Sequence, residues 1–227
     1  MLLRLKLISL TRSMTKDKLP NPNLIHPVKN HYDVIYPKNV NTSKRISIGD
    51  FTYISESSFK NNVIGNYGYS NDKLIIGKFC QIGKNVRFLL NDVNHEMNCI
   101  STFPFYIFDD WNESRPNNKV FVHKGNIIIG NDVWIGQNVT ILPGIKIGNG
   151  AIIGANSTVG SNIPDYAIAV GNPCKIIKYR FSKKIINELN NIKWWDLKLE
   201  KIKKITHLLK SPNISEAINK IKRYLNS

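Results

Sequence analysis

A six-residue hydrophobic repeat constrains the fold of this 227-residue chain more than any other feature of its sequence. Every sixth residue from position 129 to position 159 is aliphatic: Ile129, Ile135, Ile141, Ile147, Ile153 and Val159. Glycine follows most of them, at Gly130, Gly136, Gly148, Gly154 and Gly160. The residue four positions after each aliphatic one is small or β-branched: Val133, Val139, Ile145, Ala151, Ser157 and Ile163.

Neither the 3.6-residue period of an α-helix nor the two-residue alternation of a hairpin produces this phase. A parallel β-helix does, because each unit of six residues forms a short strand and a corner, and three units close one coil. We expect the aliphatic residue to point into a narrow core and the glycine to permit backbone angles that a side chain would forbid. A conventional β-sandwich leaves the phase unexplained. Periodicity alone does not give the hand of the coil, since parallel connections are normally right-handed.

The limits of the repeat divide the chain. The same register recurs upstream at Ile48-Gly49, Ile76-Gly77 and Ile82-Gly83. We therefore predict an N-terminal extension over residues 1–44, an all-β domain over residues 45–180 and C-terminal helices over residues 181–227. The phase lapses at about residues 55–72 and 88–125, where we expect long excursions, and loops on a rigid scaffold commonly carry function. Ser182 is the expected N-cap of the first helix, and further helices are expected over residues 197–210 and 215–225.

The composition favours a soluble protein of the cytoplasm. The chain is 42% hydrophobic and has no apolar run of 18 residues. Its first thirteen residues resemble an export signal, but Arg4 and Lys6 interrupt the apolar stretch and no cleavage site follows, so Met14 is a possible start. Three widely spaced cysteines suit a reduced compartment better than a disulfide framework, and no metal-ligand spacing occurs.

The formal net charge of +16 requires a hypothesis about partners. Basic proteins attract polyanions, which include nucleic acid, anionic membranes and phosphorylated ligands. A large share of the lysines falls after residue 174 on predicted helices, where a solvated face explains most of the charge. We expect no nucleic-acid or membrane partner, but a few lysines could bind a phosphate.

Several strings of residues in and around the repeat resemble the xenobiotic acetyltransferases. This branch of the hexapeptide-repeat acyltransferases includes the streptogramin A acetyltransferases and the type B chloramphenicol acetyltransferases. The matching strings run from Asp72 to Cys80, from Asn94 to Met97, from Phe103 to Phe105, from Ile129 to Gly136 and from Gly171 to Pro173, and include the Trp194-Trp195 pair. The sequence departs from the family at Tyr53, which is followed by Ile54 rather than an aromatic residue, and at Ser161, where a lysine is common.

The resemblance implies a left-handed parallel β-helix with a protruding loop and a C-terminal helical appendage. It also implies a homotrimer with active sites between subunits, and acetyl transfer from acetyl-CoA to a hydroxyl group. His95 matches the catalytic base of the family. Candidate acceptor-binding residues are Tyr53, Tyr67, Asn94, Met97 and Phe105. Candidate residues for binding acetyl-CoA are Trp134, Gly154, Ala155, Lys175, Lys178 and Arg180.

The residues themselves are consistent with direct transfer. Attack of a hydroxyl on a thioester needs a base that titrates near neutral pH, which suits His95. No Gly-x-Ser-x-Gly elbow occurs, and a buried apolar role is expected for Cys80. A carbonyl or a carboxylate should hold the second ring nitrogen of His95, and Glu96 is adjacent to it. His123 is expected to be structural or to line a pocket.

These observations predict an acetyl-CoA-dependent O-acetyltransferase that acts on an antibiotic-like acceptor, a streptogramin A of the virginiamycin M type. Chloramphenicol, a sugar or another small metabolite are alternative acceptors, because a fold of this kind serves many substrates. A non-catalytic basic β-helix that binds a polyanion is the alternative from another class, and such a protein would not need His95.

Overall fold

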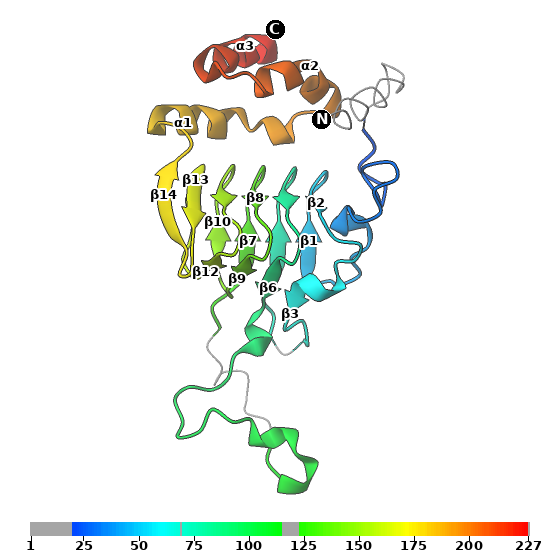
Figure 1. Ribbon diagram of the computed structural model, residues 1–227, viewed down its shortest axis with the longest axis vertical. Helices are drawn as coiled ribbons and strands as arrows, with labels where there is room; N and C mark the ends of the chain where they lie inside the picture. Colours follow the sequence, from blue (N-terminus) through cyan, green and yellow to red (C-terminus); the bar gives the residue numbers. More distant parts are fainter. Residues whose placement is uncertain (1–19, 69, 115–122, 227) are drawn as a thin grey trace, which may run out of the picture. The chain divides into compact units, whose positions relative to one another are not determined.

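The computed structural model describes residues 20–68, 70–114 and 123–226. The chain forms two compact units, one over Pro22–Trp195 and one that combines Asp196–Ser227 with Met1–Asn21. The larger unit is a three-sided parallel β-helix in which the coils succeed one another from β1 to β12 (Figure 1). The prediction of a parallel β-helix is therefore confirmed.

Each side of the β-helix is a parallel sheet with one short strand from each coil. The first sheet contains β1 (Ile46–Ile48), β4 (Leu74–Ile76), β7 (Ile127–Ile129) and β10 (Lys146–Ile147). The second contains β2 (Tyr53–Ile54), β5 (Gln81–Ile82), β8 (Trp134–Ile135), β11 (Ile152–Ile153), β13 (Ala167–Val170) and the antiparallel edge strand β14 (Lys175–Tyr179). The third contains β3 (Val63–Ile64), β6 (Arg87–Leu89), β9 (Thr140–Ile141) and β12 (Thr158–Val159).

The six-residue repeat fills the core as its phase predicts. The aliphatic residues from Ile129 to Val159 are each at most 2% exposed. The second series, from Val133 to Ile163, is also buried throughout. Ile129 pairs in register with Ile76 and Ile147 of the neighbouring coils. Equivalent side chains therefore stack in files along the axis and form one continuous apolar core.

The glycines of the repeat have a different role from the one predicted. Gly130 and Gly136 are absent from the residues with a positive φ angle, so an unusual backbone angle does not explain them. A Cβ atom on Gly130 would lie 2.7 Å from the backbone nitrogen of Asn149, and one on Gly136 would lie 2.6 Å from that of Ala155. Glycine is required because successive coils approach too closely for a side chain.

Asparagine provides the left-handed residues at one corner. Asn85, Asn138 and Asn156 have φ angles of 58°, 58° and 59°. Asparagine tolerates this region better than most residues with a side chain. The side-chain amides of neighbouring coils are also bonded in sequence, at 3.1 Å between Asn85 and Asn138 and at 3.0 Å between Asn138 and Asn156. The ladder therefore links the corners of three coils.

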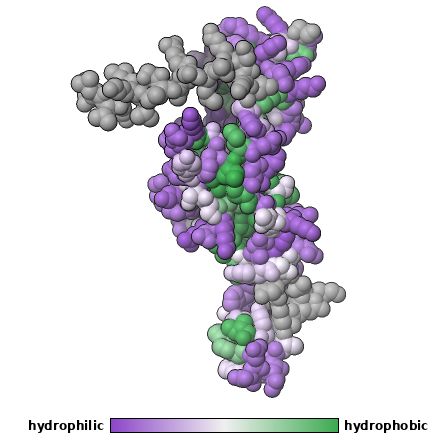
Figure 2. Space-filling view, turned by 90° about the vertical axis from the view of Figure 1, so that its right-hand side faces the viewer, coloured by the Kyte–Doolittle hydropathy of each residue, from purple (hydrophilic) through white to green (hydrophobic). Residues whose placement is uncertain are grey.

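Two excursions leave the coils near the N-terminal end of the β-helix. The first contains η2 (Lys60–Asn62) and also strand β3, whose Val63 pairs with Phe88, so the range 55–72 is not one uninterrupted loop. The second connects β6 to β7 and carries η3 (Asn91–Val93), η4 (Phe105–Ile107) and η5 (Asp109–Trp111). It extends away from the coils, and its far end carries an apolar area (Figures 1 and 2).

Short elements flank the coils. In the N-terminal segment, Ile35 forms a bridge with Ile54 and is followed by η1 (Pro37–Asn39). After β14, Ser182 stands at the N-cap of α1 (Lys183–Ile192), although its side chain makes no capping bond. Asn190 of this helix donates a 2.7 Å hydrogen bond to Asp165, which joins α1 to a corner of the β-helix.

The C-terminal unit contains two amphipathic helices. The structure places η6 (Trp194–Asp196) at the boundary, followed by α2 (Leu199–Leu209) and α3 (Ile214–Asn226). The buried residues of these two helices are aliphatic: Ile202, Ile205, Ala217, Ile218 and Ile221. Among the described residues, no helix combines the length and the apolar character that crossing a bilayer requires.

Candidate active site

The structure fixes the orientation of His95. The ring nitrogen Nδ1 lies 2.8 Å from the carbonyl oxygen of Thr102. A carbonyl oxygen only accepts hydrogen bonds, so Nδ1 carries the proton and Nε2 keeps a free lone pair. Glu96 does not perform this task, since its Oε1 accepts a hydrogen bond from the backbone N–H of Asn98. The sequence could not reveal Thr102, because the group that acts is a backbone carbonyl.

Two cavities border His95. The first has a volume of about 330 Å³ and includes Asn94, Met97 and Lys124 in its lining. The second has a volume of about 300 Å³ and includes Glu96 and Phe105. Three of the predicted acceptor-binding residues, Asn94, Met97 and Phe105, therefore lie beside the predicted base.

Phe105 belongs to an aromatic cluster in the second excursion. Its ring stacks on Trp111 with the centroids 5.3 Å apart, and it lies 5.0 Å from Phe103. Phe108 contacts both Phe103 and Trp111. All four rings are at least 39% exposed, which leaves a large apolar surface on a loop that also carries the base. Such a surface suits contact with a bulky apolar ligand or with another chain.

Asn91 holds the two ends of this excursion together. Its Oδ1 accepts hydrogen bonds from the backbone N–H of Lys124 at 3.0 Å and from the side chain of Asn94 at 3.2 Å. Its Nδ2 donates to the carbonyl of Gly125 at 3.3 Å. The residue is 4% exposed. One buried amide thus clamps the entry of the loop to its exit and also contacts the neighbour of His95, a role that sequence analysis did not identify.

The other two predicted acceptor-binding residues lie elsewhere. Tyr67 is 65% exposed and borders a groove of about 910 Å³ beside the first excursion, and neither His95 nor its cavities share this groove. Tyr53 lies on the outer face of the second sheet. Its strand position pairs with Gln81, and Gln81 pairs in turn with Trp134. Trp134 is 53% exposed, so the row offers an accessible aromatic surface on the coils.

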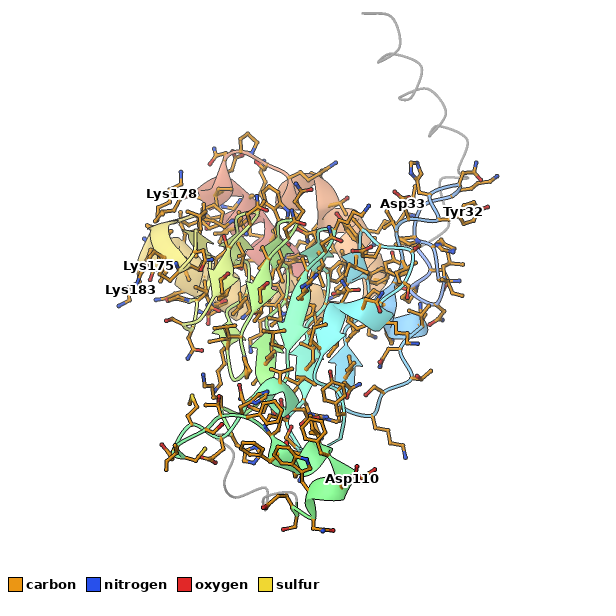
Figure 3. The ribbon with its side chains drawn as sticks, turned by 60° about the horizontal axis from the view of Figure 1, so that its bottom comes forward. Tyr32, Asp33, Asp110, Lys175, Lys178 and Lys183 are labelled. Atoms are coloured by element: carbon orange, nitrogen blue, oxygen red, sulfur yellow. The ribbon has the colours of Figure 1, made fainter. Side chains whose placement is uncertain are left out.

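The remaining candidates for binding acetyl-CoA lie toward the C-terminal end of the β-helix. Gly154 and Ala155 follow β11, and a Cβ atom on Gly154 would lie 2.6 Å from the side chain of Val170. Lys175 and Lys178 are exposed on β14, and Lys183 at the start of α1 lies at the same end of the unit (Figure 3). These three ammonium groups create a basic area that suits an anionic ligand.

Arg180 differs from these lysines because it is engaged within the fold. Its Nη1 donates a hydrogen bond to the carbonyl of Gly150 at 2.6 Å and lies 3.9 Å from a carboxylate oxygen of Asp132. The guanidinium also lies over the rings of Tyr166 and Phe181, 5.5 and 5.1 Å from their centroids. Burial raises the pKa of Asp132, and the charge of Arg180 opposes that rise.

Cys80 is unsuited to nucleophilic chemistry. The side chain is fully buried, and burial raises the pKa of its thiol to about 12. The thiolate is the reactive form of cysteine, so the thiol is inert near neutral pH. This agrees with the apolar role expected for Cys80. His123, in contrast, is exposed. Within the part of the chain that the structure describes, no group of three or more His, Cys, Asp or Glu side chains is placed to hold a metal ion.

Comparisons with known proteins identify the family. Residues 126–161 match the family model of the bacterial transferase hexapeptide (six repeats). A probable macrolide acetyltransferase of Lysinibacillus sphaericus is 46% identical over 168 residues, which cover 73% of this chain and 93% of the relative. A virginiamycin A acetyltransferase of Staphylococcus aureus is 41% identical over 192 residues, which cover 83% and 87%. A chloramphenicol acetyltransferase of Klebsiella aerogenes is 44% identical over 144 residues, which cover 63% and 69%.

These similarities extend over most of the length of each relative and include far more than the repeat. The coils, the orientation of His95 and the relatives agree with one another. The chain therefore belongs to the xenobiotic acetyltransferase family of hexapeptide-repeat transferases, and it is an acetyltransferase.

Proposed function

We propose that this protein transfers the acetyl group of acetyl-CoA to a hydroxyl group of a streptogramin A antibiotic, with His95 as the general base. The proposed enzyme is a homotrimer of left-handed β-helices in the cytoplasm, and its active site combines the second excursion of one subunit with the coils of another. The observation that carries the proposal is the 2.8 Å contact between His95 Nδ1 and the carbonyl oxygen of Thr102, because it leaves Nε2 free to accept a proton.

The proposed reaction is a direct transfer. Nε2 of His95 removes the proton of the acceptor hydroxyl while its oxygen forms a bond to the thioester carbon. The C–S bond then breaks, and the imidazolium returns the proton to the departing thiolate of CoA. The products are an acetyl ester and free CoA, so no covalent intermediate on Cys80 is needed. The high pKa of that thiol supports this route.

The donor is proposed to bind along the second sheet. Trp134 offers an exposed ring near the reactive end, and the backbone around Gly154 and Ala155 offers polar groups to the pantetheine amides. The exposed Lys175 and Lys178 are placed to bind phosphates. Arg180 supports the β13–β14 hairpin through Gly150 and Asp132, so we assign it the role of holding these lysines in place.

The choice of a streptogramin A as the acceptor rests on the extent of similarity. The virginiamycin A acetyltransferase matches 83% of this chain, whereas the chloramphenicol acetyltransferase matches 63%. A macrolide hydroxyl is the second candidate acceptor, because a probable macrolide acetyltransferase is 46% identical over 93% of its own length. The aromatic cluster around Phe105 suits either of these bulky and largely apolar molecules.

The proposal is tested by following CoA thiol release from acetyl-CoA with a streptogramin A, a macrolide, chloramphenicol and a panel of sugars. We expect turnover with the streptogramin A, and a loss of kcat of about 100-fold or more in the His95→Ala variant, the size expected for removing a general base. The His207→Ala variant, which changes an exposed histidine of α2, is the matched control and should retain wild-type kcat.

Two results would overturn the proposal. Turnover with no acceptor in the panel would remove the assigned activity, and undiminished kcat in His95→Ala would remove the assigned base. In the first case the polyanion-binding alternative predicts retention of the protein on heparin at moderate salt, independent of His95.

A further inference from the structure

A buried carboxylate three residues before His95 joins the two excursions. The side chain of Asp92 is 0% exposed. Its Oδ2 accepts hydrogen bonds from the backbone N–H groups of Tyr67 and Gly68, both at 2.9 Å. Its Oδ1 accepts from the N–H of Ser70 at 2.7 Å and from the hydroxyl of Ser70 at 2.5 Å. Asp92 therefore holds the tip of the first excursion through both of its oxygens.

Arg45 connects this carboxylate to the coils. The arginine immediately precedes β1, and its carbonyl accepts a hydrogen bond from Leu74 of β4. Its guanidinium donates to Asp92 at 2.8 Å and to Asp72 at 2.7 Å. Its Nε donates to the backbone carbonyl of Asp72 at 2.9 Å. Asp92 and Asp72 are thus neutralised in part by one cation that stands on the rigid first sheet.

The contacts of Asp92 lie outside the apolar core of the coils. They involve the tip of the first excursion and Arg45, whereas the core consists of the stacked aliphatic files. Asp92 belongs to η3, and this element also contains Asn91, the clamp between the two ends of the second excursion. His95 follows η3 after one residue. One short 3-10 helix therefore fixes the position of the first excursion and the start of the segment that carries the base.

We propose that Asp92 is a positioning residue that determines acceptor specificity, because it fixes Tyr67 and the groove beside it relative to the backbone that leads to His95. This inference rests on the proposed function, since Tyr67 is a wall of the proposed acceptor site. Replacement of a carboxylate oxygen by an amide would direct an N–H group at N–H donors, either at those of Tyr67 and Gly68 or at that of Ser70. The tip of the first excursion would then lose its fixed position.

The test is steady-state kinetics of the Asp92→Asn variant with the streptogramin A and acetyl-CoA. We expect KM for the acceptor to rise about tenfold or more, consistent with the loss of charged hydrogen bonds to the loop. We expect kcat and KM for acetyl-CoA to stay within about twofold of wild type, since Trp134 and the β14 lysines are unaffected. Asp33→Asn, which changes an exposed aspartate of the N-terminal segment, is the matched control (Figure 3).

A second variant keeps the proposal testable if Asp92→Asn does not fold. Ser70→Ala removes one hydroxyl donor to Asp92 and should raise the acceptor KM by about two- to fivefold, again without changing KM for acetyl-CoA. An unchanged acceptor KM in both variants would overturn the inference while the proposed function stands. Equal losses for both substrates together with a lower melting temperature would also overturn it, because they indicate a purely structural role. Absence of turnover in the wild type would instead reject the proposed function itself.

Discussion

Cys80 illustrates how burial in a coil controls the chemistry of a single residue. Its thiol lies 3.1 Å from the carbonyl oxygen of Gly130, and its pKa rises from 9.0 to about 12. The folded state therefore retains a proton that the unfolded state releases as the pH rises above 9.0. The stability that this residue contributes is complete below that pH and declines as the pH approaches 12.

The three cysteines should consequently react at very different rates. At a pH of about 8, close to the ordinary pKa of a thiol, we expect iodoacetamide to modify Cys99, which is exposed in the second excursion, in the native protein. Cys80 should react only after unfolding, and Cys174 should react slowly because burial raises the pKa of its thiol. Peptide mass spectrometry of samples with and without denaturant measures both rates. Equal labelling of Cys80 and Cys99 in the native protein would contradict the burial of Cys80.

Gly150 is a residue at which a side chain should be poorly tolerated. Its φ angle is 63°, and a Cβ atom would lie 2.4 Å from the ring of Tyr166. We expect Gly150→Ala to lower the free energy of unfolding by about 2–4 kcal/mol, which combines backbone strain with steric overlap. Gly125→Ala is the matched control, because Gly125 has a φ angle of 88° and an added Cβ atom would meet no described atom within 4 Å. Denaturant unfolding should give a loss of about 1 kcal/mol for this control, and equal losses in both variants would exclude the overlap.

At the scale of elements, the sequence predicts what depends on local periodicity and misses what depends on contacts between distant segments. The inward files from Ile129 to Val159 follow from a fixed interval of six residues, so the coils could be predicted in detail. The partner of His95 is a backbone carbonyl of Thr102, which leaves no pattern in the sequence. Asp92 acquires its meaning only when residues 67–70 fold against it. The glycine pattern suggests unusual backbone angles, whereas the close spacing between coils explains it.

The edge strand β14 provides a test of donor binding. Lys175 and Lys178 are exposed on this strand, and they are proposed to bind the phosphates of acetyl-CoA. Their joint replacement by alanine should raise KM for acetyl-CoA about tenfold and leave kcat unchanged, because the reacting atoms are not touched. The effect should shrink as the salt concentration rises. Lys29→Ala, at an exposed lysine of the N-terminal segment, controls for the loss of net charge, and an equal effect of this variant would argue against a specific phosphate site.

At the scale of the whole molecule, the candidate residues of one chain form separate groups. The cavities beside His95 include neither Tyr67 nor Trp134, and the groove beside Tyr67 includes neither His95 nor Trp134. The aromatic surface around Phe105 is exposed although it is large and apolar. These two facts have one common explanation if the second excursion of one subunit covers the coils of a neighbour, as in the proposed trimer.

A mixing experiment distinguishes a shared site from a site within one subunit. One parent carries His95→Ala, and the other carries Lys175→Glu with Lys178→Glu, which should prevent donor binding at low acetyl-CoA concentration. If each site takes His95 from one subunit and the donor surface from the next, about a quarter of the sites in randomly mixed trimers contain neither change. Co-expression with separate affinity tags should therefore restore about a quarter of wild-type activity, in particles of about three times the monomer mass by light scattering. No recovery in mixed trimers would mean that each subunit holds a complete site, and a monomeric mass would reject the proposed assembly.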